Sequence, residues 1–396
     1  MYTESLREML KMAYEDERYD RAYIDETVAL CDAFYAEQNE KSKIMFGYPT
    51  NIEPLSPLTA YFFFRDVQAP LANNCGDNYE RGNYRMDSKE IEKKIVSLFA
   101  EKFGAGEDFW GYITSGGSES NFCGIDNSFL KYPNGILYYS QAAHYSVAKQ
   151  AAHYRAQVIP TLATAEDKID GAVLCETVQA NYEKSGAPAN MVLTFGTTRY
   201  GERDDIEGIV AYMENHGIPF YLHVDAALFG GIPNNQEDAP LITDMKGQKI
   251  DSTCVSFHKY LGFPEVKSLF LAQKKPEGRY IPYIGHTDTT TAGSRAIPPF
   301  ALYNHVRERL TLQAKDAYKK NITYFEALLN EKGIAFYRAE QSNIFVVDDP
   351  GENIDKQFQL ACFQNRNGQA KAHVIIFPYH TKASMQALAE ALQAAF

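Results

Sequence analysis

The sequence predicts an α/β protein built on a mostly parallel sheet, with a helical segment before it and a smaller α+β region after it. From about residue 108, apolar strand-like runs alternate with segments of helical periodicity. The residues up to about Lys43 are charged and helical in pattern, and the composition changes again near Pro298. Strands and helices that alternate at this pace need crossover connections, which favour parallel, buried strands.

The first elements are helices and loops. The helical pattern ends near Lys43, and a loop-rich stretch follows that contains four prolines, Pro49, Pro54, Pro57 and Pro70. Asp87 then resembles an N-cap, with Glu90 three residues later, and an amphipathic pattern continues to about Phe103. We therefore expect a capped helix directly before the first strand.

The sheet is predicted from short apolar runs that follow one another through the middle of the chain. These runs are Trp110 to Ile113, Ile136 to Tyr139, Gln157 to Pro160, Met191 to Phe195, Phe220 to Val224 and Thr253 to Val255. Beyond Pro299, a long helical pattern reaches about Asn330, and strand and helix signals then alternate to Phe396. We expect an N-terminal helical and loop segment over 1–86, a large domain over 87–297 and a small α+β domain over 298–396.

Composition excludes several classes of function. The chain has 396 residues, 45% of them hydrophobic, which is enough to bury a large core. With 51 acidic against 39 basic residues, the net charge is −12 and no basic cluster stands out, so nucleic acid is not expected as a partner. The longest apolar stretches, such as Tyr61 to Phe64, are far too short to span a membrane. We expect a cytoplasmic protein that binds a small molecule.

The cysteines and histidines do not suggest a metal centre. The six cysteines are scattered along the chain, without metal-ligand spacing, and are expected to be reduced. Among the nine histidines, His223 is paired closely with a carboxylate at the end of a predicted strand, Asp225. We expect no structural metal.

A glycine-containing turn follows the first predicted strand, in the segment from Thr114 to Asn121. Gly116 and Gly117 permit close approach of a ligand to the backbone, and the amides that begin the next helix favour an anion. This pattern suits a phosphate, although an ordinary strand-to-helix turn has the same residues. Neither the Walker nor the dinucleotide fingerprint is present.

Two further motifs stand at the ends of predicted strands. His223 and Asp225 share one face of their strand, which permits either a metal site or a buried carboxylate aimed at a cationic nitrogen; a lone carboxylate here is also commonly a cap. Lys259 follows the run that ends at Val255. A partly desolvated lysine there would have a lowered pKa and act as an amine nucleophile, whereas a solvated lysine would have no such role.

The order of the motifs is more informative than any one of them. A phosphate-type turn, a ring at His144 that is able to stack, a carboxylate at Asp225 and an amine at Lys259 follow one another along the chain. Pyridoxal phosphate chemistry needs an anchor for the phosphate, an aromatic cover for the ring, a carboxylate for the pyridine nitrogen and a lysine for the Schiff base. The sequence therefore predicts pyridoxal 5'-phosphate as the cofactor.

The chain resembles the group II pyridoxal-phosphate-dependent amino-acid decarboxylases, in particular their bacterial histidine-decarboxylase-like branch. Matching segments run nearly end to end: Gly47–Pro49, Asn73–Asp77, Thr114–Asn121, Leu137–Ser140, His144–Lys149, Gly196–Thr198, Asp204–Ile206, His223–Leu228, Ser256–Lys259 and Asp288–Arg295. The resemblance implies the aspartate-aminotransferase type of fold (fold type I), with a mostly parallel seven-stranded sheet. It also implies a homodimer whose active sites are shared between subunits.

The resemblance further implies a role for each of ten residues. It places the Schiff base on Lys259, the pyridinium partner on Asp225, the stacked ring on His144 and the proton donor on Tyr283 of a mobile loop. The remaining six would bind the cofactor: Gly117, Ser118, Ala227, His258, Thr198 and, from the other subunit, Ser294.

The expected reaction is decarboxylation of an L-amino acid, histidine or a related one, to an amine and carbon dioxide. Two segments depart from the family pattern: 260–267, which is bulky and charged instead of rich in Gly, Ser and Pro, and 296–297, which reads Ala-Ile instead of Asn-Gly. These departures keep open an enzyme of the same fold that carries out transamination, oxidation or side-chain cleavage. A scaffold built on an inactive decarboxylase is disfavoured because Lys259, Asp225 and His144 are all present.

Overall fold

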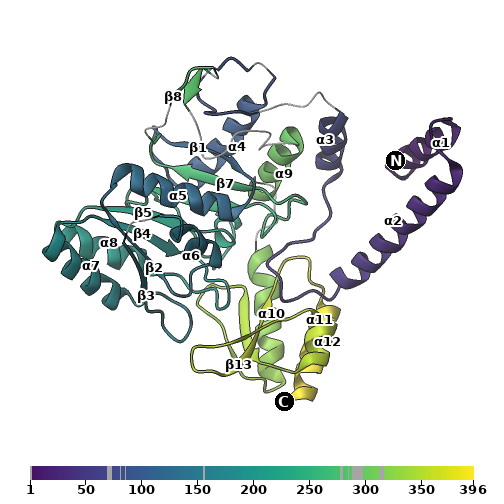
Figure 1. Cartoon of the computed structure of the whole chain (residues 1–396). Coiled ribbons are helices and arrows are strands. Elements are labelled where there is room, and N and C mark those ends of the chain that lie inside the picture. Colours follow the sequence, from purple (N-terminus) through teal and green to yellow (C-terminus); the bar gives the residue numbers. More distant parts are fainter. Residues whose placement is uncertain are drawn as a thin grey trace.

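A seven-stranded sheet forms the centre of the computed structural model, which describes residues 2–68, 74–80, 82–84, 86–154, 157–276, 280–283, 285–287, 298–311 and 316–396 (Figure 1). Its strand order is β1-β7-β6-β5-β4-β2-β3. The bounds are β1 (Trp110–Thr114), β2 (Ile136–Ser140), β3 (Val158–Thr161), β4 (Ala189–Thr194), β5 (Phe220–Asp225), β6 (Ser252–Ser256) and β7 (Ser268–Ala272). β7 pairs antiparallel with β1 and β6, and the other pairs are parallel. The predicted fold class is confirmed.

Helices cover both faces of this sheet. α4 (Lys89–Lys102) packs against β1 with Val96 and Phe99, in the same core cluster as Ile113. α5 (Gly117–Lys131) contacts the other face, where its Cys123 packs with Tyr112. Neighbouring strand residues point to opposite faces, so the two helices enclose β1 between them. The segments between successive strands also contain α6 (Tyr145–Ala151), α7 (Gly171–Ser185), α8 (Ile206–Asn215) and the short 3₁₀ helix η1 (Phe229–Gly231).

The N-terminal segment contains three helices. α1 (Tyr2–Glu15) and α2 (Arg21–Ser42) form an arm that projects away from the rest of the protein (Figure 1). α3 (Pro57–Gln68) lies in the stretch that we expected to be loop-rich, and it packs against α9 (Pro299–Thr311). That expectation was wrong for α3 because Pro57 occupies the first helical position, where a missing amide hydrogen costs nothing.

The C-terminal part is a small antiparallel sheet with helices beside it. Its strand order is β10-β11-β13-β12, from β10 (Phe336–Tyr337), β11 (Ile344–Asp348), β12 (Ala361–Gln364) and β13 (Ala370–Ile375). The helices are α10 (Ala317–Glu331), α11 (Glu352–Phe358) and α12 (Lys382–Ala395). A separate hairpin joins β8 (Tyr280–Ile281) to β9 (His286–Thr287). The domain boundaries at 87 and 298 stay a prediction.

The predicted elements lie close to the observed ones. Each of the six apolar runs forms a strand, with ends within two residues of those predicted. The helix expected after Asp87 is α4, but its N-cap is Ser88; the carboxylate of Asp87 instead accepts a hydrogen bond from the amide of Lys89 at 3.2 Å. In the described part of the chain, no helix has the length and apolar character needed to cross a membrane.

Candidate active site

Three of the predicted motifs, the glycine turn, Asp225 and Lys259, lie at one edge of the central sheet. β1 and β6 are both antiparallel to β7, so they run in the same direction as each other and as β5. Their carboxyl ends, at Thr114, Ser256 and Asp225, therefore face the same edge. This edge receives the glycine turn from β1, the carboxylate from β5 and the lysine from β6.

Asp225 is a buried carboxylate held by several donors. Its Oδ2 accepts a hydrogen bond from Asn121 Nδ2 at 2.8 Å, and its Oδ1 accepts one from the amide of Ala227 at 3.1 Å. Burial alone would raise the pKa of Asp225, but Lys259, the Asn121 amide and the rings of His144 and His223 hold it below its usual value. Asp225 is therefore an anion aimed at a site that would favour a cationic nitrogen.

Lys259 lies in the turn after β6, and its charge acts on both Asp225 and His144. The turn is fixed by Asn51, whose amide donates to the carbonyl of Lys259 at 2.9 Å and whose Nδ2 donates to the carbonyl of Tyr260, also at 2.9 Å. Gly262 continues the turn with a φ of 73°. The backbone of Lys259 is thus immobilised while its side chain is half-buried.

The glycine turn offers a cradle for an anion. α5 begins at Gly117, directly after Gly116, whose φ of 140° favours glycine, so the first amides of the helix face the sheet edge. A Cβ on Gly117 would lie 3.0 Å from Ser256 Oγ, which shows how closely this turn approaches the end of β6. Ser118 is exposed beside it.

His258 adds a buried nitrogen to the same place. Its Nδ1 is buried and has no hydrogen-bond partner among the residues that the structure describes. Burial lowers the pKa of His258, and the neighbouring Lys259 charge acts in the same direction. A buried nitrogen without a hydrogen-bond partner indicates that a polar ligand binds here. Together with the free helix amides and the ionised Asp225, it fits a phosphate at one end of the site and a protonated ring nitrogen at the other.

His144 forms the N-cap of α6, where its Nδ1 accepts a hydrogen bond from the amide of Ser146 at 3.3 Å. The ring is half-buried, and burial together with the charge of Lys259 lowers its pKa against the opposing effect of Asp225. The charges of Asp225 and Lys259 therefore both act on the ring of His144, whose role as the stacked ring stays a prediction.

Sequence reasoning missed Asn121, which connects the buried polar groups. Its amide contacts Asp225, Ser146 and His223, with His223 Nε2 lying 3.1 Å from Asn121 Oδ1. His223 Nδ1 in turn lies 2.8 Å from Ser252 Oγ, so both ring nitrogens make hydrogen bonds. Neither nitrogen is then available to bind a metal, which was one of the two roles considered for His223. Asn121 ends the Thr114–Asn121 motif, but only the fold brings it to Asp225.

For the other predicted residues, the structure gives fewer contacts with Asp225, Lys259 and His144. Ala227 adjoins Asp225, as its amide bond to that carboxylate shows. Thr198 is exposed in the turn after β4, the strand beside β5. Tyr283 is 78% exposed on the β8–β9 hairpin. Ser294 lies outside the described residues. The roles of these four residues stay predictions.

The first half of the altered segment 260–267, from Tyr260 to Phe263, is buried, whereas Pro264 and Val266 are exposed. Tyr260, Leu261 and Phe263 are almost fully buried, and the carbonyl of Leu261 accepts a hydrogen bond from His305 Nε2 of α9 at 2.7 Å. Its bulk therefore anchors the lysine turn to α9.

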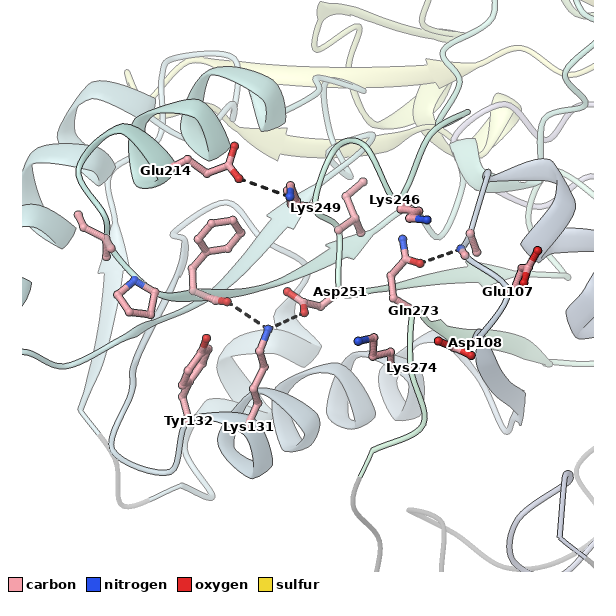
Figure 2. A pocket seen from close by; sticks show the side chains of 16 residues that line it. Glu107, Asp108, Lys131, Tyr132, Glu214, Lys246, Lys249, Asp251, Gln273 and Lys274 are labelled. Carbon is pink, nitrogen blue, oxygen red and sulfur yellow. Dashed lines mark hydrogen bonds and ion pairs between the residues drawn. The ribbon is translucent and has the colours of Figure 1, made fainter.

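A cavity of about 860 Å³ lies at the opposite edge of the sheet (Figure 2). Its lining comes from residues before β1, β5 and β6, after β7, and at the ends of α5 and α8. Its charges are balanced and partly paired, with Lys131 2.8 Å from Asp251 and Lys249 3.6 Å from Glu214. It shares no residue with the edge that carries Lys259.

Comparisons with known proteins show which family and fold this chain resembles. The pyridoxal-dependent decarboxylase conserved domain matches residues 130–275. Serine decarboxylase 2 of Oryza sativa subsp. japonica is 32% identical over 364 residues, which cover 89% of this chain and 74% of that protein. Histidine decarboxylase of Pseudomonas entomophila (strain L48) is 31% identical over 371 residues, covering 90% and 88%. The solved structure of L-methionine decarboxylase from Streptomyces sp. 590 superposes with a TM-score of 0.79 at 20% identity, covering 95% and 96%.

Proposed function

The chain belongs to the pyridoxal-dependent decarboxylase family, and on this premise we propose that it decarboxylates histidine or a related L-amino acid. It is an amino-acid decarboxylase that uses pyridoxal phosphate. This finding replaces the alternatives of transamination, oxidation and side-chain cleavage that the altered segments had kept open. When bound, the cofactor supplies a conjugated ring that withdraws electrons from the bond between Cα and the carboxylate.

The observation that carries the proposal is the ionised, buried Asp225 beside Lys259 and His144. A buried anion with fixed donors holds a proton on a neighbouring ring nitrogen, which strengthens electron withdrawal. In our proposal Lys259 holds the cofactor covalently and His144 covers its ring. The amides of Gly117 and Ser118 and the imidazole of His258 bind the phosphate, Ala227 packs beneath the ring, and Thr198 and the partner's Ser294 complete the cofactor site.

Histidine and serine are the two substrates to compare, because relatives that act on each are about equally similar to this chain. The full-length protein, loaded with pyridoxal phosphate, is incubated with an equimolar mixture of L-amino acids, and the amines and carbon dioxide are measured by mass spectrometry. We expect the amine of histidine. Selective formation of the amine of serine would contradict this choice of substrate, and keto acids without carbon dioxide would contradict decarboxylation.

We also propose that the protein forms a homodimer. The support for this is the N-terminal arm, which α1 and α2 form. In α2, Ile24 is the buried residue, whereas Leu30 is 70% and Phe34 53% exposed. These two are four residues apart and lie on one helix face. A long helix is rarely stable unless its apolar face packs against something. We therefore propose that a second copy of the chain packs against Leu30 and Phe34.

Charge on this face should weaken the dimer. Light scattering after gel filtration should show more monomer for Leu30→Asp with Phe34→Asp than for wild type, while Asn39→Asp, exposed on the opposite face of the same helix, is the control. Shared sites are tested by mixing Lys259→Ala with Tyr283→Phe chains, since one site of each mixed dimer would then contain both native residues. Mixed dimers as inactive as both parents would contradict sites shared through Tyr283.

A cytoplasmic location completes the proposal. All six cysteines are free thiols, as expected for a reducing compartment. Cell fractionation with antibody detection tests this location, and recovery outside the cytoplasmic fraction would contradict it.

A further inference from the structure

A continuous chain of hydrogen bonds links Asp225 to His144 through Asn121 and Ser146. Asn121 Nδ2 lies 2.8 Å from Asp225 Oδ2 and 3.1 Å from Ser146 Oγ. Ser146 Oγ lies 2.8 Å from His144 Nδ1. Both linking residues are buried, with Ser146 1% and Asn121 2% exposed, so water does not compete for these bonds. The direction of each bond follows from the chemistry of its atoms.

The ionised Asp225 sets the direction at one end. A carboxylate only accepts hydrogen bonds, so the Asn121 atom facing it must be the nitrogen. Turning the amide over would place Oδ1 against the carboxylate and replace the hydrogen bond to Asp225 with a repulsive contact between two acceptors. Asn121 therefore donates one of its two N–H groups to Asp225 and the other to Ser146.

A side branch through His223 is consistent with the same orientation. Burial lowers the pKa of His223 to about 4, so the ring is neutral near pH 7 and carries one proton. Because Asn121 Oδ1 accepts, this proton is on Nε2, and Nδ1 accepts from the hydroxyl of Ser252. The oxygen of Ser252 in turn accepts from the hydroxyl of Tyr221 at 2.9 Å. Every donor in the branch meets an acceptor.

At the other end, Ser146 determines which nitrogen of His144 is bare. Its oxygen accepts from Asn121, and its single hydroxyl proton is then directed to His144 Nδ1. The backbone amide of Ser146 also points at Nδ1, at 3.3 Å. Two donors converge on this atom, so it cannot carry a proton of its own.

We propose that Asn121 and Ser146 are positioning residues that hold His144 as a neutral imidazole whose only ring proton is on Nε2. Among the described residues, Nε2 has no hydrogen-bond partner, which leaves its N–H available to an oxygen of the substrate. His144 then orients an anionic substrate without taking up the proton that Cα must receive. This consequence rests on the proposed place of His144 beside the cofactor, whereas the tautomer is a property of the chain itself.

The tautomer can be measured directly by NMR of the full-length protein with ¹⁵N-labelled histidine, loaded with pyridoxal phosphate. Protonated and bare ring nitrogens have different ¹⁵N shifts, and His144→Gln identifies the signals of His144. We expect a bare Nδ1 and a protonated Nε2 at pH 7. A protonated Nδ1 would overturn the proposal whatever the substrate of the enzyme proves to be.

Two variants of Ser146 test the role of the hydroxyl. In Ser146→Ala the donor that favours a bare Nδ1 is lost, so the pKa of His144 should rise, moving the acidic limb of the kcat profile up by about one pH unit. Ser146→Thr keeps the hydroxyl and should restore both the ¹⁵N shifts and the pH profile. If Ser146→Ala keeps the wild-type shifts and acidic limb, Ser146 does not set the state of His144 and the proposal fails.

Discussion

Asn83 donates a hydrogen bond from Nδ2 to the backbone carbonyl of Tyr283 at 2.8 Å, and so ties the tip of the β8–β9 hairpin to a segment 200 residues earlier. The backbone of Tyr283 is therefore held while its ring is 78% exposed. A held backbone with a free side chain suits a residue that acts on a ligand or on another subunit.

Tyr283→Phe should lower turnover by about 10² or more if the hydroxyl delivers the proton to Cα, since proton transfer contributes that much in other enzymes. Its melting temperature should match wild type because the exposed hydroxyl supports no packing. Steady-state kinetics and thermal unfolding provide the measurements. Tyr280→Phe, on the same hairpin and 64% exposed, is the control. Unchanged turnover in Tyr283→Phe would show that Tyr283 is not the acid.

Asp225→Asn should retain the fold and lose activity by several powers of ten, because a neutral amide cannot keep a proton on the cofactor's ring nitrogen. Circular dichroism checks the fold, and product formation gives the activity. A chelator is the parallel treatment. Loss of activity with the chelator, together with full activity in Asp225→Asn, would contradict the assigned role.

Borohydride reduction of the loaded enzyme should fix the cofactor on Lys259, the lysine in the turn next to Asp225. Peptide mapping by mass spectrometry locates the label. Lys259→Ala should abolish labelling, whereas Lys267→Ala, a few residues later, should leave it in place. A label on another lysine in the wild-type enzyme would refute the assignment.

Gly124→Ala should destabilise the protein, because a Cβ at this position of α5 would lie 2.3 Å from Nδ1 of the buried His223 ring. Overpacking of this kind costs typically 1–3 kcal/mol, so we expect a loss of about 2 kcal/mol or more. Denaturant unfolding measures the change. Gly171→Ala is the matched control, since its Cβ would lie 3.7 Å from Ile209, in ordinary contact. Equal stability of the two variants would show that α5 moves away from β5 at little cost.

Stability should fall as the pH is lowered from about 6.5 to 4, partly because of His305. Burial lowers the pKa of His305 to about 4, so in this range the unfolded chain takes up a proton that the folded chain does not. One such group accounts for at most about 3 kcal/mol. His305→Gln keeps a donor for the carbonyl of Leu261 and should show a flatter pH dependence of unfolding. An identical pH dependence would mean that His305 does not contribute.

Much of the fold was predictable because strand periodicity and strand ends are local properties of the sequence. Asp225 and Lys259 follow apolar runs, so their place at one sheet edge follows from parallel connections. Asn121 was not predictable, since its role depends on contacts with Asp225, 104 residues later, and with Ser146. The helix α3 was missed because prolines and aromatic residues hide its pattern. The sequence alone did not explain why the residues from Tyr260 to Phe263 are bulky. The structure explains it, because they are buried and Leu261 is hydrogen-bonded to His305 of α9.

The clamp of Asn51 on the lysine turn has a consequence for how the enzyme is made. Asn51 and Tyr260 are 209 residues apart, so the turn that carries Lys259 is completed by a contact of very long sequence separation. Contacts of this kind form late, because a long loop must close before they contribute stability. During synthesis, Asn51 leaves the ribosome long before its partner exists. The nascent enzyme should therefore acquire its cofactor only after most of the large domain has been translated and folded.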